Sequence, residues 1–235
     1  MRDVNLNKSC SASDIITLDL HGKTITSGDK FFNVNNKLTV KDSSEGGGTQ
    51  ALNVKFCVFS NGTLAVDNSY TGEISRVELQ AGGALEAYTG TIQELLLGKG
   101  NGTGYSVKLW KGNTSVCIIG KITDSTTSKG LTVKDLLKTN HAKCELYGEK
   151  DGAWSIVPKT KKISELTGYT AYKVQFAECV HQCDDDTVEK PVCSKCGKVL
   201  VVKITATASD GKTRTAWFPV DSAIENGDGY VEAIQ

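Results

Sequence analysis

Short runs of alternating apolar and polar residues recur along the first half of the chain, each followed by a turn. The central apolar residues of five such runs are Leu18, Leu38, Leu64, Leu85 and Val107. They are separated by 20, 26, 21 and 22 positions. Alternation with a period of two indicates strands with one buried face. Because the turns lie too close together for a helix between them, the repeats predict the coils of a parallel β-helix.

The alternative architecture is an antiparallel β-sandwich. The dipeptides Asn61-Gly62 and Asn101-Gly102 are typical of hairpin turns and would support it. However, Phe59–Asp67 resembles Val34–Asp42 in sequence and in chain direction. This recurrence in one direction favours parallel coils.

The composition fits a mainly β protein with many tight turns, because the chain has 24 Gly, 3 Pro and 1 Met. Lys plus Arg and Asp plus Glu both number 27. This balance gives no overall field to attract nucleic acid or an anionic membrane. No apolar run approaches the roughly 18 residues of a membrane helix, and the N-terminus lacks the apolar region of a signal peptide. We therefore expect no membrane insertion, and we expect Met1 to mark where a fragment begins.

The character of the sequence changes after the predicted β-helix of residues 1–130. Thr132, followed three residues later by Asp135, predicts a short capped helix. Two strand-like runs flank Gly148–Gly152, which predicts a hairpin. Together with a strand over 171–176, these elements form a small α+β closing element at residues 131–178.

The last part of the chain, residues 199–235, predicts a strand, a short helix and a second strand. The first strand covers Val199–Ala208. The helix is indicated by the shared face of Val220, Ala223 and Ile224. The final strand covers Tyr230–Ile234.

Four of the eight cysteines cluster, at positions 179, 183, 193 and 196, whereas Cys10, Cys57, Cys117 and Cys144 are widely separated. A Cys-x-His pair followed by Cys-x-x-Cys-Gly supplies four donors suited to tetrahedral zinc without an open position. The predicted ligands of this structural zinc are Cys179, His181, Cys193 and Cys196, within a zinc-knuckle-like insert at residues 179–198.

Other interpretations of this cluster stay open. Cys183 could replace His181 as a ligand. Two disulfides would be an alternative in an exported protein. A catalytic zinc would want a nearby carboxylate base, and Asp184–Asp186 is the nearest candidate, although a solvated acidic loop is the simpler interpretation.

No other set of residues predicts catalysis. His21 and His141 are isolated, and His141 with Cys144 spans a helix-to-strand junction unsuited to activating a thiol. The glycine-rich stretch Gly98–Gly104 resembles a phosphate loop, but a strand-like run follows it in place of a helix, which favours a wide turn. The aromatic residues that could line a sugar-binding face, although core positions are commoner for them, are Tyr88, Tyr105, Trp110, Trp154 and Trp217.

The segments ITLDLHGKTI and FNVNNKLTVKDSS resemble the β-helical modules of large repetitive surface proteins from Gram-positive, often gut-dwelling bacteria. Those modules are similar to the pectate-lyase-type right-handed β-helix without its catalytic residues. The segment LTVKDLLKTNHAKCELYGEKDGAWSIV is similar to the closing element of such a module. AECVHQC with VCSKCGK resembles its Cys/His insert, and TAWFPVDSAIENGDGYVEAIQ resembles the opening of a following module.

This resemblance implies a right-handed β-helix in an extracellular, cell-wall-associated protein, without enzymatic activity. The expected role is a stalk and adhesive surface for host glycans or glycoproteins, in contact with neighbouring modules of the same chain. Two alternatives remain: a receptor for a host protein such as an immunoglobulin, and a carbohydrate-active β-helix enzyme. The enzyme would require an acidic cluster with Arg or Lys on one coil face.

Overall fold

The computed structural model describes residues 3–45, 52–100, 104–111, 115–138, 140, 144–176, 201–207 and 209–219. The chain divides into two compact units, Met1–Gln175 and Phe176–Gln235. The first unit contains the predicted coils and the elements that follow them. The second contains one described pair of strands.

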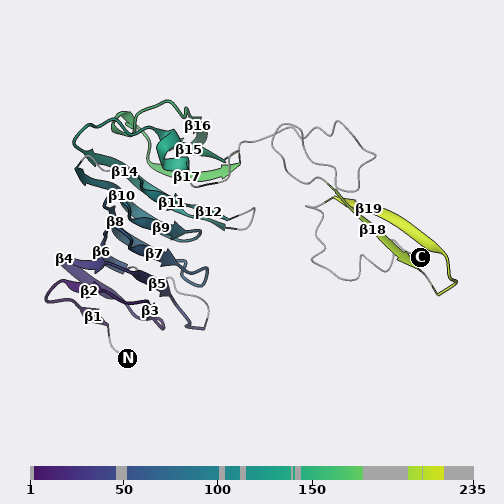
Figure 1. The fold of residues 1–235 in the computed structure, drawn as a ribbon, viewed down its shortest axis with the longest axis horizontal. Coiled ribbons are helices and arrows are strands. Elements are labelled where there is room, and N and C mark those ends of the chain that lie inside the picture. The colour runs from purple at the N-terminus through teal and green to yellow at the C-terminus, as the bar shows by residue number, and fades with distance from the viewer. Residues whose placement is uncertain are drawn as a thin grey trace. The chain divides into compact units, whose positions relative to one another are not determined.

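The first unit is a stack of coils in which each coil contributes one strand to each of two sheets (Figure 1). Sheet A contains, in order, β1 (Val4–Asn5), β4 (Ile25–Val34), β6 (Leu52–Val58), β8 (Glu73–Leu79), β10 (Thr91–Gly100), β14 (Ile118–Thr126), β17 (Ala171–Phe176), β15 (Cys144–Lys150) and β16 (Ala153–Val157). Strand β2 (Cys10–Ala12) also pairs with β4. Sheet B contains, in order, β11 (Ser106–Lys108), β9 (Ala84–Ala87), β7 (Thr63–Val66), β5 (Lys37–Lys41) and β3 (Ile16–Asp19).

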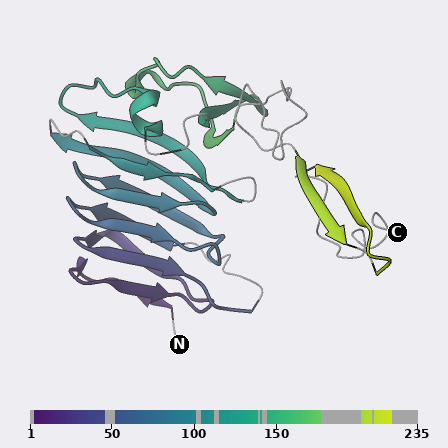
Figure 2. The ribbon, with the colours of Figure 1, turned by 45° about the vertical axis from the view of Figure 1, so that its right-hand side comes forward.

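All strand pairs within sheet B are parallel, as are the pairs of sheet A from β1 to β14. Figure 2 shows the coils lying one above another along the first unit. The mainly β class and the parallel β-helix are therefore confirmed over about four turns. The antiparallel sandwich is wrong.

The register of sheet B confirms most of the alignment predicted from the repeats. Leu38 pairs with Leu64, Leu64 with Leu85, and Leu85 with Val107. The placement of Leu18 is wrong, because Ile16 pairs with Leu38. A shift of two residues keeps every side chain on the same face of a strand, so alternation alone does not separate the two alignments.

The core lies between the two sheets and is formed by their inward rows. One inward ladder of sheet A joins Phe32, Phe56, Val77, Leu95 and Ile122. Facing it, Leu38, Leu64 and Leu85 of sheet B are fully buried. Burying an aliphatic or aromatic side chain of this size contributes about 1.5–3 kcal/mol, so each added coil extends one continuous core.

The corners from sheet A to sheet B depend on glycine. A Cβ atom on Gly62 would lie 2.2 Å from the carbonyl oxygen of Val34 in the preceding coil. At the equivalent corner of the next coil, a Cβ atom on Gly83 would lie 2.7 Å from the carbonyl oxygen of Val58. Asn61-Gly62 therefore marks a corner between sheets and is not a hairpin turn.

The end of the coil stack is closed by α1 (Val133–Leu137), which follows the last parallel strand, β14. The Thr132 backbone N–H donates to Asp135 Oδ2 at 2.9 Å, so the predicted cap is confirmed. Just after α1, the Asn140 side chain covers the edge of sheet B. Its Oδ1 accepts from the Leu109 N–H at 3.1 Å, and its Nδ2 donates to the Val107 carbonyl at 2.9 Å.

Beyond α1, the strands of sheet A change direction. Strands β15 and β16 pair antiparallel about Asp151 and Gly152, both of which have positive φ. The short 3₁₀ helix η1 (Ile163–Glu165) leads to β17, which covers the predicted strand at 171–176 and pairs antiparallel with β14. Between β11 and β14, β12 (Trp110–Lys111) pairs antiparallel with β13 (Ser115–Val116).

The second unit contains β18 (Val201–Thr207) and β19 (Thr213–Pro219), which pair antiparallel. The strand predicted at 199–208 is confirmed over β18. Strand β19 was not predicted. The predicted helix with Val220, Ala223 and Ile224 and the strand at 230–234 lie outside the described residues.

Candidate functional site

The outer face of sheet B has a hollow of about 230 Å³ that crosses several coils. One outward row of this sheet joins Thr39, Ala65 and Glu86, and Glu86 pairs with Lys108. Because Ala65 has the smallest side chain of the row, the face is recessed at that point. The residues that line the hollow are Lys37, Thr39, Ala65, Val66, Asp67, Asn68, Glu86, Tyr88 and Lys111. We refer to it below as the Ala65 hollow.

One wall of the Ala65 hollow is aromatic. The Tyr88 side chain is half-buried, and burial raises the pKa of its phenol, so the ring is neutral at physiological pH. The Lys111 ammonium lies 5.8 Å from the centre of the Tyr88 ring, within the range of a cation–π contact. This wall therefore offers an apolar ring beside a cation.

The other walls carry carboxylates held by neighbouring groups. Glu86 Oε1 lies 2.7 Å from the Lys108 ammonium, and this contact raises the pKa of Lys108. Asp67 Oδ1 accepts from the Ser69 N–H at 2.9 Å, which lowers the pKa of Asp67. Each carboxylate accepts up to about four hydrogen bonds, so both keep capacity for hydroxyl donors.

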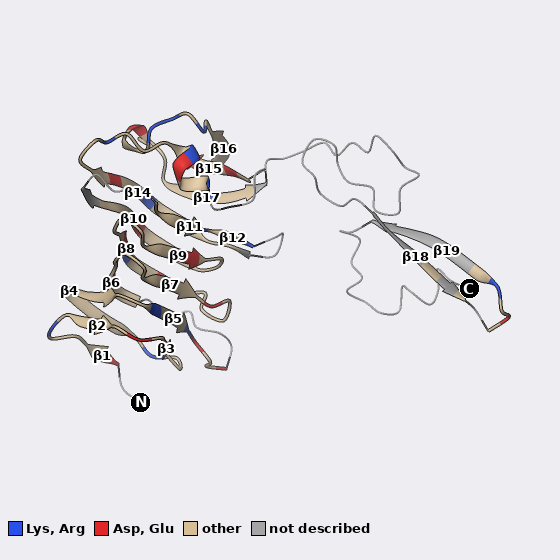
Figure 3. Cartoon of the chain, in the orientation of Figure 1, with Lys and Arg blue, Asp and Glu red and all other residues tan. Residues whose placement is uncertain are grey.

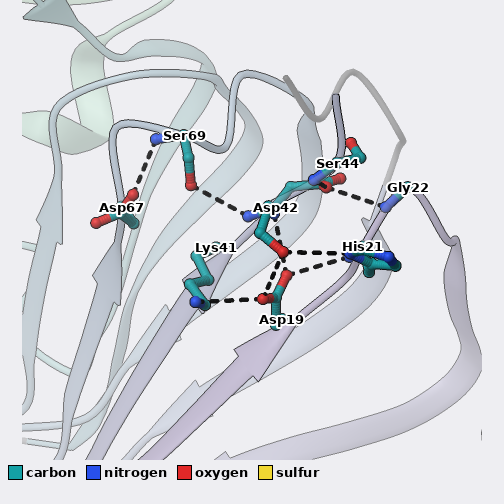
Figure 4. A network of polar contacts seen from close by, with 9 residues as sticks. Asp19, His21, Gly22, Lys41, Asp42, Ser44, Asp67 and Ser69 are labelled. Atoms are coloured by element: carbon teal, nitrogen blue, oxygen red, sulfur yellow. Dashed lines mark hydrogen bonds and ion pairs between the residues drawn. The ribbon is translucent and has the colours of Figure 1, made fainter. Parts of the chain in front are cut away.

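Asp67 belongs to a repeated turn at the end of the sheet B strands (Figure 4). In three successive coils an aspartate Oδ1 accepts from the N–H two residues later: Asp19 from His21 at 3.2 Å, Asp42 from Ser44 at 2.9 Å, and Asp67 from Ser69 at 2.9 Å. Such Asx turns replace the backbone hydrogen bonds that a strand loses where it ends.

The same aspartate turns also link neighbouring coils. Asp42 Oδ1 accepts from the Gly22 N–H at 3.0 Å, and the Asp42 N–H donates to Ser69 Oγ at 3.2 Å. Asp42 is only 1% exposed. Burial pushes the pKa of Asp42 upward, but hydrogen bonds from Ser44 and Gly22 outweigh it and lower that pKa. The three aspartates are thus ionised, and their hydrogen bonds fix the corner beside the Ala65 hollow.

The aspartate turns bring Asp19, His21 and Ser43 together, a combination that resembles a nucleophilic triad. Ser43 Oγ donates to Asp19 Oδ2 at 2.8 Å and lies 3.3 Å from His21 Nδ1. In a triad the histidine accepts the serine proton and the carboxylate orients the histidine. Here the Asp19 carboxylate accepts the Ser43 hydroxyl directly and is also paired with Lys41 at 3.2 Å. These three residues therefore order the turn.

The outer face of sheet A carries a row of opposite charges. Arg76 lies 3.6 Å from Glu78 and 3.6 Å from Glu94, and Lys121 lies 3.7 Å from Glu94. The Gln80 amide also donates to Glu78 at 2.6 Å. Charged residues of both signs are spread over the coils (Figure 3). The charges of this row are therefore paired with one another.

A second hollow, of about 350 Å³, lies where β14 meets η1. Its lining includes Lys121, Thr123, Lys129 and Ser164 but no aromatic residue. The Lys129 ammonium donates to the Asp124 carbonyl at 2.6 Å, so this cation already has a structural partner.

The aromatic residues named from the sequence have different positions. Tyr88 lines the Ala65 hollow, Tyr105 is buried, and Trp110 packs against the core. Trp154 has the Lys173 ammonium 4.4 Å from its ring. The Trp217 side chain lies outside the described residues.

The predicted zinc ligands Cys179, His181, Cys193 and Cys196, with the substitute Cys183 and the acidic stretch Asp184–Asp186, lie outside the part of the chain that the structure describes. Within that part, no three His, Cys, Asp or Glu residues are grouped to hold a metal ion. Cys10, Cys57 and Cys117 are free thiols. Burial raises the pKa of Cys117 to about 12, so this thiol is a core residue.

No protein-family model, curated protein or solved structure matches the chain. None of the helices in the described ranges is long and apolar enough to cross a membrane.

Proposed function

We propose that this chain is a non-enzymatic module of an extracellular, cell-wall-associated protein, serving as a stalk that binds host glycans or glycoproteins. The observation that carries the proposal is the Ala65 hollow. A neutral ring at Tyr88, carboxylates at Asp67 and Glu86 and the Lys111 cation surround a small recess. Sugar rings pack their C–H faces on aromatic rings and donate hydroxyls to carboxylates, so these residues suit a saccharide.

The stacked coils support the stalk role. Each coil contacts mainly its neighbours, which gives an extended structure with a continuous outer face. The polar stack of Asp19, Asp42 and Asp67 holds the corners of successive coils together beside the hollow. A rigid support of this kind reduces the entropy lost when a ligand binds.

A glycan array probed with the whole chain tests the adhesive function. For the saccharides retained, Tyr88→Ala and Ala65→Gln should each weaken binding about tenfold or more, equivalent to about 1.4 kcal/mol. Ala84→Gln is the matched control, because Ala84 faces outward on the same sheet but does not line the Ala65 hollow. Equal binding by both glutamine variants, or no binding to any glycan, would contradict the proposal. Capture of an immunoglobulin from serum in place of glycans would favour a host-protein receptor.

A second candidate, a carbohydrate-active β-helix enzyme, is favoured by the charged row on sheet A. Glu78 and Glu94 flank Arg76 there, and paired carboxylates beside a basic residue are the arrangement such an enzyme requires. Polysaccharide turnover that is lost in Glu94→Gln and kept in Glu73→Gln would establish this candidate. It would replace the non-enzymatic proposal.

We further propose that the right-handed coils are followed by a structural zinc insert at residues 179–198. The support is the donor set, three thiolates and one imidazole, which suits a closed tetrahedral zinc site. Native mass spectrometry should find one zinc per chain, lost with Cys193→Ser. Disulfides among Cys179, Cys183, Cys193 and Cys196 would contradict it.

A further inference from the structure

The two sheets differ at the N-terminal end of the coil stack. On sheet A, β1 and β2 cover most of the outer edge of β4. Two backbone N–H groups near that edge are met by side chains: Thr24 donates to Asp3 Oδ1 at 2.9 Å, and Phe31 donates to Ser9 Oγ at 3.2 Å. This edge is blunted by short strands and polar side chains, a common protection against unwanted pairing.

On sheet B, the edge strand β3 has no such cover among the described residues. It pairs only with β5, and Ile15 and Ile16 beside its open edge are 75% and 37% exposed. An uncovered strand edge with exposed apolar side chains is a template for pairing with another strand. The apolar row that begins at Ile16 continues through the whole of sheet B, so a further strand would extend an existing ladder.

The hydrogen bonds of β3 show which backbone groups face the open edge. The Leu20 N–H donates to the Lys41 carbonyl of the adjoining coil at 3.0 Å. Because the direction of backbone groups alternates along a strand, those of Ile16 and Leu18 also face β5. The N–H and C=O groups of Ile15, Thr17 and Asp19 therefore point to the open edge.

We propose that β3 is a self-association surface, and that it pairs antiparallel with β3 of a second copy of this chain about a two-fold axis at Thr17. In this register Thr17 faces Thr17 of the other copy, and Ile15 faces Asp19. These are the residues whose backbone groups are directed outward, so each facing pair exchanges hydrogen bonds. On the core side, Ile16 of one copy packs against Leu18 of the other.

Registers with the axis at Ile16 or Leu18 would also let the outward-facing backbone groups of β3 pair. The axis is therefore placed at Thr17 from the side chains that face each other. An axis at Thr17 places aliphatic residues opposite each other and Thr opposite Thr, both favourable cross-strand pairs. It also keeps the two Asp19 carboxylates apart, each paired with its own Lys41 at 3.2 Å. An isologous contact of this kind is the usual geometry of a homodimer.

The interface is small, so the dimer is expected to be reversible and dependent on concentration. Sedimentation equilibrium of the full chain over a wide concentration range measures it directly. Thr17→Pro removes the central N–H that faces the open edge and leaves the hydrogen bonds to β5 in place, since proline is tolerated on such an edge. The expected result is a dimer for the natural chain and a folded monomer for Thr17→Pro at the same concentration.

Thr17→Lys is a second variant, because it sets two ammonium groups opposite each other in the dimer. Its matched control is Thr63→Lys, on the interior strand β7 of the same sheet, which should leave the dimer unchanged. Amide exchange at Thr17 and Asp19 of the natural chain should slow as its concentration rises. A chain that is monomeric at every concentration, or a dimer that persists in both Thr17 variants, overturns the proposal.

Discussion

The two ends of sheet B show how a coil stack is stopped and how it is left open. At the end near α1, the Asn140 amide reproduces the hydrogen bonds of a missing strand, accepting from Leu109 and donating to Val107. At the other end, β3 has no equivalent side chain in the described residues, and Ile15 and Ile16 are exposed. The Asn140 amide and the short helix α1 are enough to end sheet B, to which further coils could otherwise add strands in the same way.

The largest effect is expected at the closed end, from Asn140→Ala. The change removes the acceptor of the Leu109 N–H and a donor to the Val107 carbonyl beside the core, so the free energy of unfolding should fall by about 2–3 kcal/mol. Urea unfolding followed by circular dichroism measures it. The control is Asn53→Ala, an exposed position within sheet A, where a change below about 0.5 kcal/mol is expected. Equal effects at both positions would show that Asn140 does not close the stack.

A smaller loss is expected from the cap of α1. Asp135→Ala removes the acceptor of the Thr132 N–H and hydroxyl and should cost about 1 kcal/mol. Thermal unfolding of this variant should be compared with that of Lys134→Ala, an exposed change on the same helix. If the lysine variant is as unstable as the aspartate variant, the cap contributes nothing specific.

The two ends should also differ in their response to acid. At the closed end, burial pushes the pKa of Asp135 upward, but hydrogen bonds from Thr132 outweigh it and lower that pKa. A carboxyl whose folded pKa lies below its unfolded value of about 3.9 stabilises the protein above that pH, and the stabilisation is lost as pH falls through the folded pKa. The stability difference between the natural chain and Asp135→Asn should therefore be full at neutral pH and shrink in acid.

At the open end, hydrogen bonds from Ser43 hold the pKa of Asp19 far below its usual range. This carboxylate is exposed to solvent, which screens its interactions, so Asp19→Asn should show a smaller difference of the same sign. Unfolding curves recorded across the acid range compare the two variants. A difference that grows as pH falls would contradict the assignment for either residue.

The smallest effect is expected at the open edge, from Ile16→Thr. The side chain is 37% exposed and borders no further coil in the described residues, so dilute protein should change in stability by less than about 0.5 kcal/mol. Chemical unfolding at low concentration measures this. A loss above about 1 kcal/mol would mean that Ile16 is covered in the monomer and that the two ends are alike.

The coils were predictable because their information is local and repeated. Alternation gave the strands, and recurrence at similar spacing gave their parallel stacking. The register of Leu18 was predicted wrongly because a two-residue shift leaves the buried face unchanged. The cap at Thr132 and Asp135 was predictable for the same reason as the coils, since both residues lie within one helical turn.

The Ala65 hollow was not predictable from the sequence. It exists because Ala65 stands between Thr39 and Glu86, which come from different coils, so the register had to be known first. The closure of sheet B by Asn140 was not predictable for the same reason, because its contact with Leu109 joins residues 31 positions apart. Tyr88 was named among the aromatic candidates, but only its position beside the hollow separates it from the buried Tyr105. The zinc ligands remain a prediction.

The glycine corners at Gly62 and Gly83 have a consequence for how such a chain can change in length. At each corner an N–H donates to a carbonyl of the coil before, and the carbonyl of the corner glycine accepts from an N–H of the coil after, so each corner is interchangeable with the next. A duplication that begins at one corner glycine and ends just before the next would insert a whole coil in register, lengthening the stack by about 4.8 Å. The length of the stack is thus a quantity that genetic duplication can adjust in fixed increments, without redesign of either end.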